Sequence, residues 1–243
     1  METVNPFPLQ TKLRKMSGGV AKSCLSYFLE RKVMEGQKSF KARVKEEAIV
    51  NAKMFKEFFV ECEYLVCSDA FEKNPYYIIG AHTSNYEHLT GVSSPLSADE
   101  FFDKCLEGTL QEDDFAFFKK GQSEAEVKGS VRRKINALPN LSSLFEAETF
   151  VEEDFVKNRV KCTFAAGKTA CTLGFASSFP SKPQSLMKGN QLNADKAKTA
   201  ELVLRRRRGE KVFDEIIFGD KKAIAKYISK IQPLLSERLI GLI

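Results

Sequence analysis

The sequence predicts an α+β domain in which N-terminal helices pack on a mainly antiparallel, roughly four-stranded sheet. Two patterns indicate this class. Apolar residues recur at helical spacing from position 44 to 62, whereas from position 156 onward they alternate as in strands. Helices followed by an antiparallel meander are typical of an α+β domain. Between the two regions, a polar turn after a short apolar run holds both histidines of the 243-residue chain.

Composition limits the class of protein. With 243 residues, 43% of them hydrophobic, the chain can bury a core as one large domain or as one domain with an appended segment. No apolar run reaches the length of about 18 residues that a membrane span needs, so we expect no membrane partner. The first residues lack the apolar stretch of a secretory signal, which favours a cytoplasmic protein.

The net charge of +6 conceals a segregation along the chain. Residues 1–45 carry 10 basic and 3 acidic side chains, residues 46–155 carry 10 and 22, and residues 156–243 carry 18 and 7. A basic C-terminal third is the electrostatic pattern of a protein that binds a phosphate backbone. A solvated basic face or an acidic protein partner is the alternative.

The 6 cysteines show neither the paired spacing nor the neighbouring histidines of a zinc site. We interpret them as small buried apolar residues, and we expect no metal and no cofactor. The sequence also lacks a GxxxxGK[ST] loop, a GxGxxG turn after a strand, a GxSxG elbow and an HExxH helix. Each absence weakens the case for the corresponding class of enzyme.

Local patterns place the elements of the first half. Residues 1–40 are basic and read as an N-terminal arm or accessory helix, and residues 41–243 read as a single domain. A helix is predicted from 41 to 62, with strands at 64–67 and 76–81. Ser97 to Glu100 predicts a capped helix start and Gly108 its end. Residues 112–155 read as further helix, broken near Gly121, Gly129 and Pro139, so that an acidic helical insertion covers about 97–155.

In the second half the alternation predicts two hairpins. The first joins strands at 160–164 and 171–175, and the second joins 199–206 to 211–218. Residues 177–190, rich in Ser, Pro and Lys, read as a loop. A helix with apolar residues on one side closes the chain.

The histidine turn is the densest concentration of reactive side chains. His82 and His88 lie six residues apart, and if they converge on one phosphate, one serves as a base and the other as an acid. Thr90 and the flexible Gly91 would contact phosphate, and Asn85 a base of the nucleic acid. The alternative is an ordinary turn with one exposed histidine and one that caps a helix.

A second set of candidates lies in the meander. Lys168 falls in the first hairpin turn, Ser177 at the end of its second strand, and Lys182, Ser185 and Lys188 in the following loop. Cations and hydroxyl groups at strand ends can neutralise charge that develops on a phosphate. An ordinary polar surface loop would look the same.

The run from Arg205 to Arg208 is the strongest local charge. Alternation along a strand sends Arg205 and Arg207 to one face, where they would bind phosphate. Protection of an edge strand by charge is the alternative.

Together, several blocks resemble the phage-associated nucleases grouped with barnase, EndoU, colicin and RelE toxins. The most specific block is HTSNYEHLTG at 82–91; TACTLGFASS, PQSLMKGN and KVFDEIIFGD follow, and the resemblance covers roughly residues 42–232. It implies helices on a four-stranded antiparallel sheet and metal-independent cleavage of RNA through its 2′-hydroxyl, leaving a cyclic phosphate. It also implies that His88 and Thr90 are motif positions with Ser185 and Lys188 on the phosphate side, whereas His82 comes from its position alone.

The leading hypothesis is therefore an RNA endonuclease of toxin or phage-defence type, with RNA as substrate and an antitoxin or immunity protein as a possible partner. The acidic insertion would serve as a substrate clamp, a partner surface or a built-in inhibitor. A non-catalytic RNA- or protein-binding module is the main alternative, and a transferase such as an ADP-ribosyltransferase is a third. The catalytic hypothesis requires His88, Thr90, Ser185 and a cation to line one cleft.

Overall fold

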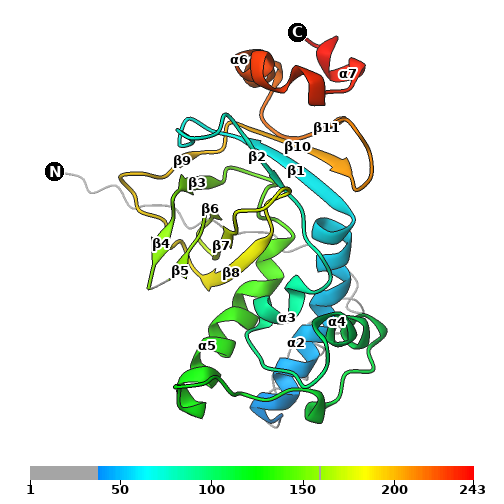
Figure 1. Ribbon diagram of the computed structural model, residues 1–243, viewed down its shortest axis with the longest axis vertical. Coiled ribbons are helices and arrows are strands. Elements are labelled where there is room, and N and C mark those ends of the chain that lie inside the picture. Colours follow the sequence, from blue (N-terminus) through cyan, green and yellow to red (C-terminus); the bar gives the residue numbers. More distant parts are fainter. Residues whose placement is uncertain (1–37, 159) are drawn as a thin grey trace, which may run out of the picture. The chain divides into compact units, whose positions relative to one another are not determined.

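The computed structural model describes residues 38–158 and 160–243 (Figure 1). The chain divides into two units, residues 1–43 and 44–243, and apart from the first residues of one helix every element below lies in the second unit. The basic arm predicted at 1–40 lies almost wholly outside the described residues, as does Cys24.

The first helix confirms the helical apolar pattern. Helix α2 (Phe40–Phe55) continues into a π-helical turn, η1 (Lys56–Val60). Ala48, Ala52 and Phe55 are buried, as the helical spacing requires. The helix ends earlier than predicted, because Cys62 already belongs to the next strand.

A four-stranded antiparallel sheet follows, with the order β11-β10-β1-β2. Its members are β1 (Cys62–Cys67), β2 (Tyr77–Ile79), β10 (Leu202–Arg207) and β11 (Glu215–Phe218). All six residues of β1 are buried, because both faces of the sheet are covered. The predicted pairing of the last two strands is confirmed.

One face of this sheet packs on the C-terminal helices α6 (Lys221–Ile231) and α7 (Glu237–Ile240), which the 3₁₀ turn η4 (Gln232–Leu234) connects. Leu65 and Leu204 of the sheet belong to the same buried cluster as Ile224 and Ile231 of α6. On the other face, Tyr64 packs on Phe59 and on Phe145, with ring centroids 6.1 and 5.2 Å apart respectively.

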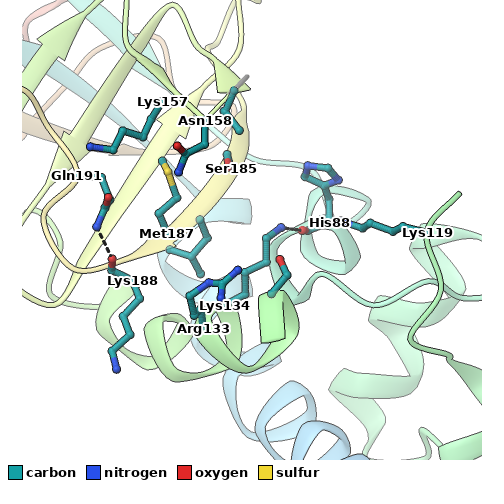
Figure 2. Close-up of a pocket in the computed structure, with 13 residues that line it drawn as sticks. His88, Lys119, Arg133, Lys134, Lys157, Asn158, Ser185, Met187, Lys188 and Gln191 are labelled. Carbon is teal, nitrogen blue, oxygen red and sulfur yellow. Dashed lines mark hydrogen bonds between the residues drawn. The ribbon is translucent and has the colours of Figure 1, made fainter. Parts of the chain in front are cut away.

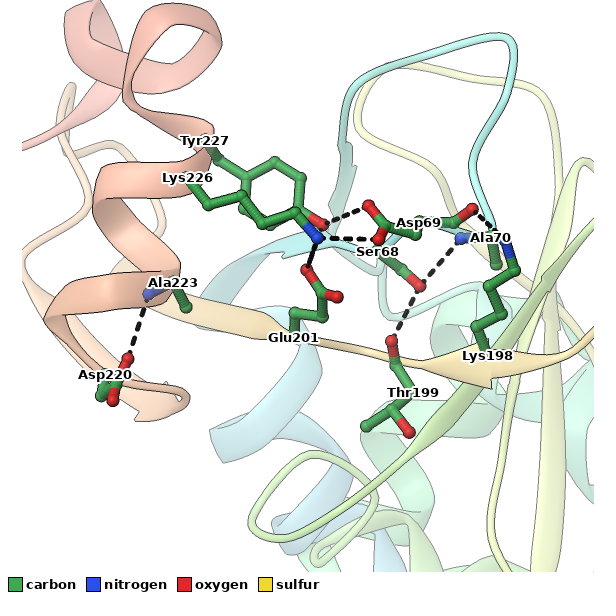
Figure 3. A network of polar contacts seen from close by, with 10 residues as sticks. All are labelled: Ser68, Asp69, Ala70, Lys198, Thr199, Glu201, Asp220, Ala223, Lys226 and Tyr227. Carbon is green, nitrogen blue, oxygen red and sulfur yellow. Dashed lines mark hydrogen bonds and ion pairs between the residues drawn. The ribbon is translucent and has the colours of Figure 1, made fainter.

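A polar network connects α6 to the residues just before β10 and just after β1 (Figure 3). Nζ of Lys226 lies 2.7 Å from Asp69 and also contacts Glu201. The Tyr227 hydroxyl donates to Glu201 at 2.6 Å. The hydrogen bond from Lys226 lowers the pKa of Asp69, and the hydrogen bonds to Asp69 and Glu201 raise the pKa of Lys226. The charged forms of these residues are therefore stabilised by one another.

The second sheet is antiparallel and has five strands in the order β8-β7-β6-β3-β9. They are β3 (Phe150–Glu153), β6 (Phe164–Gly167), β7 (Cys171–Phe175), β8 (Pro183–Lys188) and β9 (Lys198–Thr199), and a small ribbon of β4 (Val156–Lys157) and β5 (Val160–Lys161) lies beside them. The first hairpin is confirmed as β6 and β7, although it begins at Phe164 rather than at residue 160.

Two strands of this sheet occur where the sequence predicted none. Residues 177–190 contain β8, and the segment read as helix to residue 155 contains β3. Strand β8 begins at a proline and lies at the sheet edge, where only its pairing with β7 makes it a strand. Sequence patterns do not show such pairing, which explains both errors.

The remaining helices confirm the local capping signals. They are α3 (Asn85–Thr90), α4 (Ala98–Glu107) and α5 (Glu124–Ala137), with the 3₁₀ turns η2 (Glu112–Asp114) and η3 (Leu138–Leu141). Ser97 and Glu100 form a capping box, and Gly108 ends α4 in the left-handed conformation. The break predicted near Gly129 is wrong: α5 passes through it because Val127 and Val131 are buried on either side.

The described cysteines support their interpretation as apolar core. Cys62, Cys67, Cys105, Cys162 and Cys171 are all buried and unpaired. Of the described helices, none is both long and apolar enough to cross a membrane.

One contact between the sheets positions the site. The Ser181 amide donates to Ile78 O at 2.7 Å, and the Gly80 amide donates to Ser181 O at 3.1 Å. These bonds attach the segment just before β8 to the end of β2, and α3 begins a few residues after β2. The edge strand of one sheet and the histidine-bearing helix are thereby placed side by side.

Candidate active site

The polar histidine turn folds as the short helix α3, and most of its side chains support the fold. Asn85 Oδ1 accepts a hydrogen bond of 2.7 Å from the His82 amide, and the buried Tyr86 hydroxyl donates to Ala48 O at 2.6 Å. Tyr86 also packs on Phe55, with ring centroids 5.1 Å apart. These contacts hold α3 against α2 and so determine its orientation.

The end of α3 is equally well determined. The Thr90 hydroxyl donates to Glu87 O at 2.7 Å and is fully buried. Gly91 ends the helix with φ of 83°, a left-handed conformation that glycine adopts readily. Within the motif NYEHLTG, therefore, His88 is the reactive side chain that remains exposed.

His88 lies at a pocket of about 460 Å³ between α3, α5, β8 and β4 (Figure 2). Among the described residues, five lysines and arginines line it and no carboxylate does. These cations are Lys119, Arg133, Lys134, Lys157 and Lys188. Polar side chains complete the lining, namely Ser130, Asn158, Ser185 and Gln191. A pocket of this composition suits a polyanion.

Ser185 reaches the pocket from the edge strand β8. It pairs with Gly174 of β7 and is 8% exposed. Lys188 ends the same strand with its side chain exposed, and its carbonyl accepts a hydrogen bond of 2.9 Å from Gln191 Nε2 (Figure 2). The structure therefore brings His88, Ser185 and Lys188 to one cavity, although they are far apart in sequence.

Lys134 is the cation most firmly held in the pocket wall. Its Nζ donates to His88 O at 2.6 Å (Figure 2). Its aliphatic stem passes over Gly91, where an added Cβ would lie 2.7 Å from Cδ of Lys134. Gly91 is thus required twice, for its positive φ and for the passage of this side chain.

The pocket lowers the pKa of the His88 imidazole and of the Lys134 ammonium. The His88 side chain stays accessible, but the pocket walls remove part of the water around its ring. This partial burial, followed by the charges of Lys134 and Lys119, holds its pKa below the usual 6.5, and a hydrogen bond with the Gln184 backbone opposes the shift. Burial, followed by the Lys119 charge, lowers the pKa of Lys134 to about 8. At neutral pH the imidazole is therefore mainly uncharged and the ammonium still holds its proton.

Three residues of the predicted catalytic turn do not line the pocket. Thr90 is buried with its hydroxyl bonded within α3, and Asn85 is bonded to the backbone of His82. His82 does not line the pocket and is largely exposed; the partial burial that remains, and then the charges of Lys182 and Arg208, lower its pKa. His82 precedes α3 and does not line this pocket, so of the two histidines only His88 reaches it.

Most of the residues in the C-terminal strands that were predicted to bind phosphate also lie outside the His88 pocket. Lys168 donates to Ser143 O at 2.6 Å, and Ser177 lines a different pocket of about 320 Å³ beside Phe179. Arg205 is bonded to Glu215 at 2.7 and 2.8 Å. The backbone of Arg207 bonds to Glu210, in the turn after β10. Of this set, only Lys188 and Ser185 reach the His88 pocket.

The other two arginines of the run are structural. Arg206 bonds Glu63 at 2.7 Å, with each side chain only about an eighth exposed, and stacks 4.4 Å above the Phe213 ring centre. Arg208 donates to Ala81 O at 2.6 Å. The charges of Arg205, Arg206 and Arg208 therefore meet carboxylates and a carbonyl of the protein itself.

Sequence reasoning missed most of the pocket cations. Arg133 and Lys134 lie on α5, Lys157 on β4, and Lys119 in the loop before α5. One signal was available: the run RRK at 132–134 is basic within an otherwise acidic segment. Nothing local, however, connects that run to His88.

No metal ligand set accompanies the pocket. Within residues 38–158 and 160–243, no group of three His, Cys, Asp or Glu side chains is arranged to hold a metal ion. Lysine and arginine are the groups available to neutralise phosphate charge at this site.

Of the comparisons with known proteins, one found a match. No match was found among curated proteins or among solved structures. A family model described as phage-Barnase-EndoU-ColicinE5/D-RelE like nuclease4 matches residues 49–233, which include α3, α5, β8 and the whole described pocket lining. Because the match spans most of the chain, the protein belongs to this family of nucleases.

Proposed function

We propose that the protein is a metal-independent RNA endonuclease that cleaves at the His88 pocket. One observation carries the proposal: a single histidine shares a pocket with two serines and five cations, and no described carboxylate lines it. The family supports nuclease chemistry, and the composition of the pocket favours RNA as the substrate.

The preference for RNA follows from what the lining can and cannot supply. Hydrolysis of DNA requires an external nucleophile, which nucleases commonly activate with carboxylate-bound metal ions. RNA carries its own nucleophile, the 2′-hydroxyl, and needs a base, a proton donor and charge stabilisation. The described lining supplies a base and cations, but no carboxylates for a metal.

His88 is the proposed base. Its lowered pKa keeps the imidazole uncharged at neutral pH, ready to take the proton of the 2′-hydroxyl. The oxygen then attacks the adjacent phosphorus, and the bond to the 5′-oxygen breaks, leaving a 2′,3′-cyclic phosphate and a 5′-hydroxyl.

The remaining lining is suited to hold the phosphate. Arg133, Lys157 and Lys188 come from three different elements and can neutralise the charge that grows on the phosphoryl oxygens. The Ser185 hydroxyl can donate a hydrogen bond to the same oxygens. In this proposal their role is to stabilise the transition state, while His88 moves the proton.

The test is cleavage of a single-stranded RNA oligonucleotide by the purified protein in the presence of EDTA. We expect products with cyclic phosphate ends, and no cleavage where the nucleotide at the scissile bond is 2′-deoxy. His88→Ala is expected to lower the cleavage rate by roughly 100- to 10,000-fold while leaving RNA affinity largely intact.

His82→Ala is the matched control, because it removes the other histidine outside the pocket and should leave cleavage unchanged. Cleavage of the 2′-deoxy substrate, or equal activity of His88→Ala, would contradict the mechanism. RNA binding without cleavage by the wild-type protein would favour the non-catalytic binding module instead.

A further inference from the structure

The proposed reaction needs a second proton transfer that His88 alone does not provide. Departure of the 5′-oxygen leaves an alkoxide, which is a poor leaving group unless it gains a proton as the bond breaks. His82 was the sequence-based candidate for this step, but it lies outside the pocket. A proton donor must therefore come from another side chain of the lining.

Lys134 differs from the other cations of the pocket in how it is held. Its stem passes over Gly91, and its Nζ donates to the carbonyl of His88 itself. Lys157 and Lys188, by contrast, extend into solvent from strand ends. The Lys134 ammonium is thus fixed relative to the base, as a proton-transfer group must be, whereas the others are free to follow the phosphate.

We propose that Lys134 is the general acid of the reaction, opposite His88 as the base; this inference rests on the proposed function. The proton of the 2′-hydroxyl passes to the His88 ring as the bond from the 2′-oxygen to phosphorus forms. The bond from phosphorus to the 5′-oxygen breaks, and a proton of the Lys134 ammonium passes to that oxygen. The products are the cyclic phosphate, the 5′-hydroxyl, an imidazolium and a neutral amine, and water returns the proton from His88 to Lys134.

The surroundings of Lys134 suit an acid. Lysine ordinarily holds its proton too tightly to give it up near neutral pH, but here burial and the Lys119 charge bring its pKa to about 8. Among the described residues, the other charged side chains that line the pocket are Lys119, Arg133, Lys157 and Lys188, and all four are cationic. No described carboxylate of the lining stabilises the Lys134 ammonium.

The decisive experiment replaces the leaving 5′-oxygen of the RNA by sulfur. A thiolate leaves without needing a proton, so a group that acts only as the acid becomes dispensable on this substrate. Lys134→Arg keeps the charge and the donor to His88 O, but a guanidinium does not release its proton in proteins. We expect Lys134→Arg to cleave ordinary RNA on the order of 100-fold more slowly than wild type and to recover most of that loss on the sulfur substrate.

The controls separate this role from the others. Lys128→Arg makes the same change on the same helix, at a lysine that pairs with Glu124 at 2.7 Å outside the pocket, and it should act as wild type on both substrates. His88→Ala should be slowed to the same extent on both substrates, because the base is still needed. The folding of each variant is checked by its melting temperature.

Three results would overturn the assignment: normal cleavage of RNA by Lys134→Arg, an equal loss on both substrates, or rescue of His88→Ala in place of Lys134→Arg. The first two leave the proposed function standing if the wild-type protein still makes a cyclic phosphate through His88. Rescue of His88→Ala would make His88 the acid, so it would also overturn the assignment of His88 as the base, while cleavage of RNA at this pocket would stand. Absence of any cleavage by the wild type would instead remove the proposed function itself.

Discussion

Two basic regions of this protein, the arginine run of β10 and the pocket beside α3, each lie near one histidine and differ in what their charges contact. Arg205 and Arg206 bond carboxylates, and Arg208 bonds a carbonyl. Within the described residues, Lys119, Arg133, Lys157 and Lys188 form no ion pair. The side chains of three of the four arginines of the first region are bonded within the protein, Arg207 being the exception, whereas these four pocket cations have no ion-pair partner among the described residues.

This difference shows why the density of charge along a chain is a poor guide to a binding site. Consecutive arginines on one strand find partners on the neighbouring strands, and their electrostatic energy goes into the fold. Like charges gathered around a cavity repel one another until an anion enters. The informative property is therefore the absence of an internal partner, and it is visible only in the folded chain.

The largest expected effect separates the two histidines. His88→Ala should lower the rate of RNA cleavage by roughly 100- to 10,000-fold, because it removes the base, whereas His82→Ala should change it little. The measurement is the single-turnover rate on a defined oligonucleotide. Equal losses in both variants would mean that the two regions form one site after all.

A second prediction is that the arginine run contributes to the stability of the fold. Arg206→Met should lower the free energy of unfolding by about 3 kcal/mol, because Glu63, which is 9% exposed, would be left as an uncompensated buried charge. Urea denaturation measures the loss. Lys157→Met, which removes an exposed pocket cation, should stay within about 0.5 kcal/mol of wild type. A neutral Arg206→Met would show that the two regions do not differ in this way.

A third prediction distinguishes the two basic regions by the salt dependence of RNA binding. In a His88→Ala background, Lys157→Met and Lys188→Met should each reduce the slope of log affinity against log salt by about 0.7, since each removes a phosphate contact of single-stranded RNA. Arg205→Met should leave the slope unchanged, because Glu215 already neutralises that guanidinium. Fluorescence anisotropy at several salt concentrations distinguishes them, and a change of slope with Arg205→Met would place RNA on β10.

The smallest expected effect is on pH dependence. Since the pKa of His88 is lowered from 6.5, cleavage should rise with pH through a midpoint below 6.5 as the ring loses its proton. Lys119→Met removes a charge that lowers this pKa, so the midpoint should move upward by a fraction of a unit. Lys182→Met alters the surroundings of His82 and should leave the profile in place. An equal shift in both variants would assign the titration to neither histidine alone.

Much of the fold was predictable because its signals are local. The Ser97 and Glu100 capping box and the left-handed Gly108 act within a single turn of chain, and both are present as predicted. The apolar spacing of α2 and the hairpin of β6 and β7 are likewise properties of short segments. Strand β8 was missed because its conformation depends on pairing with β7 rather than on its own residues.

The candidate site likewise combines features that local patterns predict with features that depend on long-range contacts. Local residue patterns were enough to predict the α+β class, the block that carries His88, and the blocks that identify the nuclease family. The folded chain was needed to learn that Ser185 and Lys188 line a pocket with His88, that His82 and Thr90 do not, and that Lys134 of α5 bonds the His88 carbonyl. Backbone conformation depends on interactions among a few neighbouring residues, whereas contacts between distant side chains depend on the path of the whole chain. Here they depend on the backbone hydrogen bonds of Ser181, which attach the segment before β8 to the end of β2 and so place β8 beside α3.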